Sequence, residues 1–364
     1  MNKYLEQRYA LLGKTAHKEK TVVNGLRSLL SNPKLYFIIF LFIAWTAGDM
    51  VVSKIIPISY ITPYVQVFAY SIASIGFCLL MGYSGLASLG TGGFIGIGTY
   101  SVYYIMHQMG MRFWVSIVVA LVVAAVIGVI VGFISLRIEG IYLVILTLGL
   151  SEILRYAYMA LEDNIRISNK FTIFNGIEIN RSHKIFIVST ALVIVMIITH
   201  NIINSPTGRA MLAMKNSTAA AQAMGISLIK YRLMAFVICT MYAALSGVMI
   251  IIIKTSESAS LGTGSYALIT SLNVLAAVII GGYKSIWGAV FGSFIMFGMQ
   301  SAILNRIPFL RENPEIIYIA LGVIVILIVM FYPGGLAQLL LEVRTKAKKL
   351  YKTIREARYG KDLG

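Results

Sequence analysis

Long apolar runs separated by short polar stretches cover most of the chain. Ten of these runs have the length or apolar character of membrane-spanning helices, and they cover residues 35–52, 64–82, 86–107, 113–135, 140–160, 185–203, 233–253, 267–281, 286–304 and 316–332. The run at 267–281 is short, and we expect it to form a hairpin with the next run around residues 281–285. The pattern predicts an all-α, polytopic helical membrane protein with about ten transmembrane helices.

The composition excludes a water-soluble protein. Of the 364 residues, 58% are hydrophobic and only 12% are charged, whereas soluble domains carry about 25% charged residues. Residues 1–34 are polar and basic and have no apolar stretch like that of a signal peptide, so we expect the first run, from Leu35, to direct insertion itself. The sequence therefore divides into a basic cytosolic N-terminal segment (1–34), a transmembrane domain (35–332) and a basic cytosolic tail (333–364).

The distribution of basic residues predicts the orientation of the helices. An even number of crossings places both termini on one side, and the cytosolic segments of membrane proteins are enriched in Lys and Arg. With the termini in the cytosol, 21 of the 31 Lys and Arg residues lie on that side and nine lie outside. The net charge of +17 is therefore explained by topology rather than by nucleic-acid binding, and residues 205–232 are predicted to be cytosolic.

Two further segments have predicted surface roles. The tail from Arg344 to Lys361 has the pattern of a basic amphipathic helix, which favours contact with anionic lipid headgroups; a regulatory or partner-binding role is the alternative. Residues 161–184 form the longest external segment and contain seven charges of mixed sign. This segment is either a surface for an extracytoplasmic partner or a solvated connector.

The sequence contains no motif for catalysis, metal binding or nucleotide binding. Cys78 and Cys239 lie inside apolar runs, and the four histidines are scattered without the spacing of metal ligands. The sequence has no nucleophile elbow, no pair of acids at working spacing and no ATP-binding motif. We therefore expect no enzyme activity, no metal and no cofactor in this chain, so that any ATP is bound by a different subunit.

A polar, basic loop at residues 205–232 interrupts the apolar runs. Ser205 and Pro206 predict a helix start, because a hydroxyl at the N-cap accepts a backbone N–H and proline fits the first helical position. Ser217, after Asn216, predicts a second start, and Gly225 predicts a C-terminal stop. We expect two short helices that present small and apolar residues to a partner; the alternative is an ordinary basic connector.

Seven glycines lie in the 17 residues from Gly82 to Gly98. This is not a phosphate-binding loop, because no Gly-Lys-Ser/Thr ending follows. The spacing of Gly92 and Gly96 allows helix backbones to approach closely. Two explanations remain: close packing alone, or a discontinuous helix along a translocation path, where the Ser and Thr hydroxyls satisfy carbonyls freed at the break. The hydroxyls in question belong to Ser84, Ser88 and Thr91, and the residues assigned to the path are Gly82, Gly85, Ser88, Gly90, Thr91, Gly92 and Gly96.

Glu152 and Arg155 are the only clear charge pair inside an apolar run. From a helix start near Gly140, a rise of about 1.5 Å per residue places Glu152 roughly 18 Å into the helix, beyond the middle of the bilayer. Residues spaced i, i+3 share a helix face and can form an ion pair. Because charges within a membrane usually face a bundle interior or a cavity, the pair is either structural or part of the substrate path.

Four stretches, taken in order, resemble one known family. They are the glycine-rich stretch at 82–100, LTLGLSEILR at 146–155, GRAMLAMKNSTAAAQAMGI at 208–226 and GGYKSIWGAVFG at 281–292. In this order and spacing the chain resembles the permease subunits of branched-chain amino acid ABC transporters of the Liv type, from about residue 82 to residue 336. The third stretch is similar to the family's cytosolic loop, a variant of the coupling motif of ABC permeases.

The resemblance implies a membrane-spanning subunit of an ATP-driven importer in the bacterial inner membrane. Its implied partners are a second homologous permease, two ABC ATPase subunits, an extracytoplasmic solute-binding protein and membrane lipids. The loop would couple ATPase closure to alternating access, and the residues assigned to this role are Gly208, Arg209, Ala220, Ala221, Met224 and Gly225.

The chain departs from the family pattern at a few positions. The family commonly has His where Thr91 stands and acidic residues where Ser217 and Ala219 stand, and its external Gly-Gly-Pro-Asn-Gly-Ile pattern survives only as FNGI at 174–177. These departures leave the coupling role nearly intact and concern the choice of solute. Branched-chain amino acids are favoured by the resemblance; urea or short amides, other amino acids, sugars and nucleosides are alternatives.

Two other classes of function fit the sequence less well. A stand-alone, ion-coupled secondary transporter would use several membrane-embedded acids as coupling sites, and only Glu152 qualifies here. An intramembrane enzyme would need a Ser/His or acid dyad, which the sequence lacks. The ABC importer subunit is therefore the leading hypothesis.

The topology can be tested with single cysteines. In intact cells, an impermeant maleimide should label Asn175→Cys in the external segment and should reach Ser217→Cys only after the membrane is opened. The reverse labelling pattern would contradict the predicted orientation.

Overall fold

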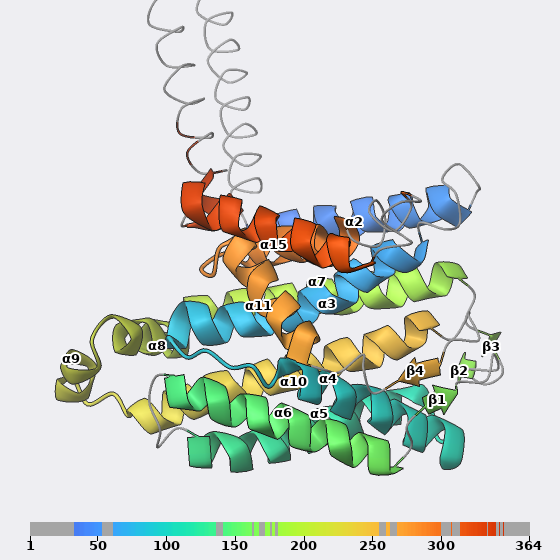
Figure 1. The fold of residues 1–364 in the computed structure, drawn as a ribbon, viewed down its shortest axis with the longest axis horizontal. Coiled ribbons are helices and arrows are strands. Elements are labelled where there is room, and N and C mark those ends of the chain that lie inside the picture. The colour runs from blue at the N-terminus through green and yellow to red at the C-terminus, as the bar shows by residue number, and fades with distance from the viewer. Residues whose placement is uncertain are drawn as a thin grey trace, which may run out of the picture.

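The computed structural model describes residues 33–52, 61–135, 141–161, 164–166, 172–174, 177–178, 181–254, 260–262, 268–299, 307, 314–332, 334–339, 342 and 345. Helices make up most of this part of the chain (Figure 1). The α-helices are α2 (Pro33–Val52), α3 (Ile61–Leu79), α4 (Thr91–Val102), α5 (Phe113–Ser135), α6 (Ile141–Leu161), α7 (Arg181–Asn204), α8 (Pro206–Asn216), α9 (Thr218–Ala223), α10 (Leu228–Lys254), α11 (Leu268–Gly281), α12 (Ile286–Ser293) and α15 (Pro314–Phe331).

Short π-helical segments extend three of these helices. They are η2 (Leu80–Ser84) after α3, η3 (Tyr103–Gln108) after α4 and η5 (Phe294–Met299) after α12. Four strands of two or three residues, β1 (Asn164–Arg166), β2 (Thr172–Phe174), β3 (Ile177–Glu178) and β4 (Ser260–Gly262), lie in the connections.

All ten predicted segments are helical over most of their length, which confirms the all-α, polytopic helical membrane fold. Five helices in the described part of the chain are long and apolar enough to cross a membrane, and the remaining apolar helices are shorter. The number of crossings therefore stays a prediction. The expected hairpin is confirmed, because α11 and α12 pack together on either side of the turn at 282–285.

The centre of the bundle is formed by α3, α4 and α10, with α10 packed closely against both α3 and α4. Buried hydroxyls lie on all three helices, among them Ser71, Thr99 and Ser246. The outward face of α5, by contrast, carries exposed Val and Ile side chains such as Val122 and Ile130. Lipid tails are as apolar as these side chains, so helices gain little by hiding them and instead associate through small and hydroxyl residues. Helices that carry buried hydroxyls therefore form the centre, and α5, the most apolar of the five long apolar helices in the described part of the chain, lies outside them.

The closest approach of α4 to α10 depends on two glycines. A Cβ on Gly98 would overlap the carbonyl of Ala244, and a Cβ on Gly247 would overlap the carbonyl of Ile95. In the space that this leaves, the Thr99 hydroxyl donates to the Gly247 carbonyl at 3.2 Å. The two backbones are thus in direct contact, as small residues allow in membrane helix packing.

The connections gather at two opposite ends of the bundle (Figure 1). At one end lie α8 and α9; at the other, β1 pairs antiparallel with β4 and so joins two of the loops that the predicted topology places outside. This pairing agrees with the predicted topology, but which end faces the cytosol stays a prediction. Residues 1–32 and 346–364, most of the two predicted basic terminal segments, lie outside the described residues, as does the expected lipid-binding pattern of the tail.

Replacing Gly98 by Ala should destabilise the bundle. The added methyl group would force α4 and α10 apart, and overpacking of a rigid site costs about 3 kcal/mol. We expect a lower melting temperature and less monodisperse protein on size exclusion. Gly322→Ala is the matched control, because no described atom lies within 4 Å of the position that its methyl group would take; equal stability of both variants would contradict the packing argument.

Candidate functional site: the broken helix and the loop helices

The backbone is not helical between η2 and α4. Gly85 adopts a left-handed conformation (φ 74°), which ends the α3–η2 helix, and residues 85–90 are irregular before α4 begins at Thr91. Figure 1 shows this segment running from the α8 end into the interior of the bundle. The predicted interruption is therefore confirmed, and its role in a translocation path stays a prediction.

Hydroxyl groups from two other helices hold the interrupted backbone. The Leu89 N–H donates to the Thr147 hydroxyl at 3.0 Å, and the Gly93 N–H donates to the Ser151 hydroxyl at 3.0 Å, both from α6. The Gly92 N–H donates to the hydroxyl of Ser271 from α11 at 2.8 Å. The first turn of α4 thus finds acceptors for its free N–H groups in a buried site, where unsatisfied groups are costly.

This arrangement corrects the expected donors. The Ser84 hydroxyl donates to the Leu80 carbonyl within its own helix, and the Ser88 hydroxyl accepts only the nearby Gly90 N–H. At the start of α4 the groups that need partners are N–H donors, and their acceptors come from neighbouring helices. Sequence reasoning missed Thr147, whose spacing of four residues from Ser151 places both hydroxyls on one face of α6.

Close packing explains several glycines of the glycine-rich segment. A Cβ on Gly82 would overlap the Tyr283 carbonyl, and a Cβ on Gly96 would overlap the ring of Tyr158. The Tyr158 hydroxyl in turn donates to the Gly93 carbonyl at 2.7 Å. Gly96 therefore makes room for a ring from α6, while the closest approach to α10 uses Gly98. Gly90, Thr91 and Gly92 are buried, and their assignment to the path stays a prediction.

Glu152 and Arg155 form the predicted ion pair. Arg155 Nε lies 2.7 Å from Glu152 Oε2, and the side chains are 21% and 31% exposed for Arg155 and Glu152, respectively. Arg155 also lies over the Tyr156 ring, 4.6 Å from its centroid. The pair is on a face of α6 that the described residues cover only in part, with Ile153 and Tyr156 exposed beside it.

The ion pair lies at the level where α4 begins. Ser151, the neighbour of Glu152, bonds the first turn of α4 through its hydroxyl. An interrupted backbone and two opposite charges therefore occur at the same depth, on the inner and outer faces of one helix. Sequence alone gave each feature separately and did not place them together.

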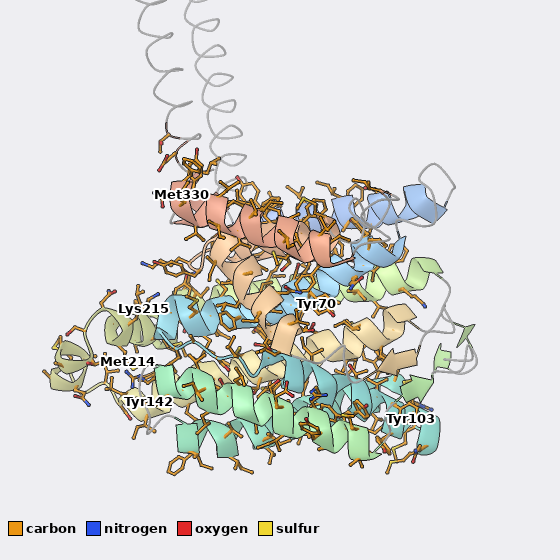
Figure 2. All side chains as sticks on the ribbon, in the orientation of Figure 1. Tyr70, Tyr103, Tyr142, Met214, Lys215 and Met330 are labelled. Atoms are coloured by element: carbon orange, nitrogen blue, oxygen red, sulfur yellow. The ribbon has the colours of Figure 1, made fainter. Side chains whose placement is uncertain are left out.

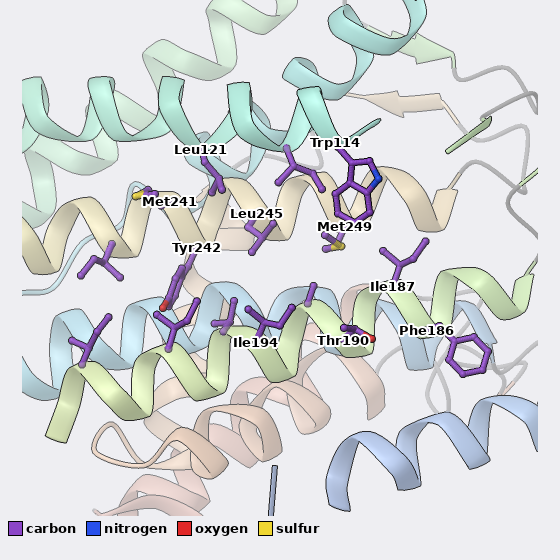
Figure 3. Close-up of a pocket in the computed structure, with 16 residues that line it drawn as sticks. Trp114, Leu121, Phe186, Ile187, Thr190, Ile194, Met241, Tyr242, Leu245 and Met249 are labelled. Atoms are coloured by element: carbon purple, nitrogen blue, oxygen red, sulfur yellow. The ribbon is translucent and has the colours of Figure 1, made fainter. Parts of the chain in front are cut away.

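A groove of about 590 Å³ lies between α5, α7 and α10. Figure 3 shows Trp114, Leu121, Ile194 and Leu245 pointing into it. None of its lining residues is charged, and the Tyr242 hydroxyl already accepts a hydrogen bond from Thr199 at 3.1 Å. Such a lining gives no charged partner for an ammonium or carboxylate group, so we assign the groove no part in the binding of an amino acid.

The loop helices have the predicted caps. The Ser205 hydroxyl accepts the Gly208 N–H at 3.4 Å, and Pro206 is the first residue of α8. The Ser217 hydroxyl accepts the Ala220 N–H at 3.2 Å and begins α9. Gly225 is left-handed (φ 76°) and the Ile226 N–H bonds the Ala221 carbonyl, which is the hydrogen bond of a Schellman stop.

The residues assigned to the coupling role differ in how far they are exposed. Ala220 is exposed and Met224 is 83% exposed, whereas Ala221 is only 3% exposed. Ala221 therefore packs against its own chain, and its assignment as an anchor for a partner is wrong. Gly208 is buried against the carbonyls at the end of α7, where a Cβ would overlap them. Arg209 is exposed, and its guanidinium group donates to the Asn204 carbonyl at 3.3 Å.

Comparison with known proteins identifies the family. Residues 59–331 match the model of the family described as "Branched-chain amino acid transport system / permease component". The chain belongs to this family. It is a multi-pass membrane permease component of ABC-type amino-acid transport, a transporter component rather than an enzyme.

Two relatives support this assignment. The chain is 26% identical over 356 residues to the high-affinity branched-chain amino acid transport system permease protein LivM of Escherichia coli (strain K12), covering 89% of this chain and 79% of the relative. It is 28% identical over 300 residues to the protein of the same name from Salmonella typhimurium, covering 73% and 67%. No solved structure matches the chain. The resemblance to Liv-type permeases is thereby confirmed.

Among the described residues, no group of three or more His, Cys, Asp or Glu side chains is arranged to hold a metal ion. The thiols of Cys78 and Cys239 are buried and are not joined in a disulfide. The polar groups that the structure brings together at the start of α4 are instead hydroxyls and backbone amides.

Removing one charge of the ion pair should lower the amount of protein in the membrane. Glu152→Gln leaves Arg155 without its counter-charge, and charges in a membrane are costly unless paired. We expect several-fold less folded permease by quantitative blotting. The double variant Glu152→Gln, Arg155→Gln is neutral and should restore the amount; if it restores the amount but not uptake, the pair belongs to the substrate path. Normal amount and normal uptake in the single variant would contradict both roles.

Proposed function

We propose that the chain is the membrane-spanning permease subunit of an ATP-driven importer of branched-chain amino acids in the bacterial inner membrane. It forms the translocation path with a second homologous permease, and it works with two ABC ATPase subunits and an extracytoplasmic solute-binding protein. Both termini lie in the cytosol. The family and the names of its relatives support the transported solute.

The shape and chemistry of α8 and α9 carry this proposal. Figure 1 shows α9 beyond the ends of the long helices, at one end of the bundle. Apart from Gln222, its exposed residues are small, and Met224, the residue that follows it, is 83% exposed. The loop also carries four basic residues and no acid. A short helix with small and apolar anchors suits a groove on a partner, so we assign α9 to the ATPase subunit, with Ala220 and Met224 as its anchors.

The exposed face of α6 supports a second permease. The ion pair is partly exposed there among apolar side chains. If this face met lipid, two charges would lie against hydrocarbon, which membrane proteins avoid. We therefore place the second permease or the solute path against this face, next to the level at which α4 begins. Glu152 and Arg155 then border the path between the two subunits.

The coupling role of α9 can be tested in the complex. Ala220→Asp places an unpaired charge in the proposed groove, at a cost of about 3 kcal/mol or more, which corresponds to about hundredfold weaker binding or more. We expect the ATPase subunits to be lost on purification and the ATP hydrolysis stimulated by loaded binding protein to disappear, while the permease still inserts. Gly225→Val should act similarly, because φ of 76° strains any residue with a branched side chain.

Ala219→Asp is the matched control. Ala219 is exposed on the same helix, and members of the family commonly carry an acid at this position. This variant should retain the ATPase subunits and most of the stimulated hydrolysis. Full stimulation in Ala220→Asp would mean that α9 is not the coupling element.

A further inference from the structure

Three segments that are far apart in the sequence meet at the C-terminal end of α8. They are η2, the last turn of α8 and the turn at 282–285 between α11 and α12. Lys215 of α8 lies at their centre, at the end of the bundle that holds α8 (Figure 2). Its ammonium group donates to the carbonyls of Met81 (3.0 Å) and Gly82 (2.8 Å), and it lies 4.4 Å from the centroid of the Tyr283 ring.

These contacts suit a cation at the end of a helix. The last carbonyls of a helix carry partial negative charge and lack helical partners, so a Lys ammonium group stabilises them. A ring face adds a cation–π contact. The partners of Lys215 in the described part of the chain are thus carbonyls and a ring rather than a carboxylate. Partial burial lowers the pKa of Lys215, and the positive charge of Lys284 lowers it further, whereas the two carbonyls and the ring favour the charged ammonium form.

The turn at 282–285 is fixed to the same helix end by its own contacts. The thiol of Cys78 donates to the Tyr283 carbonyl at 3.2 Å, and the Tyr83 hydroxyl donates to the Lys284 carbonyl at 3.3 Å. The Cα of Gly82 lies directly against the Tyr283 carbonyl. The end of α3–η2 and the hairpin turn therefore form one packed unit, to which Lys215 fastens α8.

The carbonyls that Lys215 holds lie directly before the irregular segment at residues 85–90. Gly85, three residues after the Gly82 carbonyl, has φ of 74°, and a Cβ there would lie 3.3 Å from Lys215 Cγ. From Gly85 the irregular segment leads to the first turn of α4. On the other side, Lys215 is two residues from Ser217, the N-cap of α9. A short physical connection thus joins α9 to the interrupted helix through one side chain.

We propose that Lys215 is the positioning residue through which movement of α8 and α9 is transmitted to the broken segment before α4. The proposal rests on the proposed function, because it requires that α9 docks on an ATPase subunit. Lys215 itself is not a docking residue. When α9 is moved, the ammonium group pulls on the carbonyls at the end of η2, and Gly85 allows the following segment to change its path without moving the whole of α3.

The test measures the movement of the broken segment directly. Ala87→Cys places a thiol in a half-buried position of that segment, and the chain's own two cysteines are buried. In the reconstituted complex with ATPase subunits and loaded binding protein, we expect the maleimide labelling rate at position 87 to change at least threefold between the nucleotide-free and the vanadate-trapped state. With Lys215→Met, this change should disappear, uptake should fall more than tenfold, and ATP hydrolysis should continue without responding to loaded binding protein.

Two controls separate charge from position. Lys230→Met removes an exposed lysine from the same basic loop and should keep the nucleotide-dependent change. Lys215→Arg retains a cation that can reach two carbonyls and should keep at least a third of the change. If Lys215→Met does not fold and insert in the membrane, Tyr283→Leu removes only the ring beside the ammonium and should halve the change; an unaltered change in this variant would overturn the proposal.

The outcomes distinguish this proposal from the proposed function. A nucleotide-dependent change that persists in Lys215→Met overturns the role of Lys215 and leaves the ABC subunit assignment intact. Loss of the ATPase subunits from Lys215→Met also overturns it, because Lys215 would then act in docking. If the unmodified permease itself does not retain ATPase subunits, the proposed function fails, and the role of Lys215 fails with it.

Discussion

An interrupted backbone inside the bundle is the constraint on which the rest of this structure depends. A membrane interior offers no water to the peptide groups freed at a break, so the protein must supply their partners. Here the hydroxyls of Thr147, Ser151 and Ser271 accept the N–H groups before and within the first turn of α4. This requirement places α6 and α11 against the start of α4, and the small residues around the break allow them to come near enough.

The packing of the bundle follows from the same environment. Since lipid is as apolar as a leucine side chain, burying bulky apolar residues gives little advantage, and contact area and hydrogen bonds decide which helices meet. Gly98 and Gly247 therefore hold α4 against α10, with the Thr99 hydroxyl between them. The Val- and Ile-rich α5 lies at the periphery. The ion pair on α6 is the exception, and its partial exposure is best explained by a neighbouring subunit or an aqueous path.

The contacts of Lys215 connect this interior to the loop helices. A single ammonium group holds the carbonyls at the end of η2, beside a turn from a distant part of the chain. Spatial proximity alone does not establish energetic coupling between two sites. The connection we propose to transmit movement consists of the proposed docking helix α9, the Lys215 side chain, the left-handed Gly85 and the irregular segment that leads to α4.

The sequence by itself determined the features that depend on local chemistry. The apolar runs gave the ten helical segments, and the caps at Ser205, Ser217 and Gly225 formed as predicted because their hydrogen bonds join residues at most five positions apart. Only the tertiary structure decided which groups satisfy the broken helix. Those bonds span 58 or 179 positions, which no periodicity records, so the sequence did not indicate these acceptors. Burial of Ala221 was likewise decided by the packing of α9 on its own chain, since a run of three alanines gives no preference for one face.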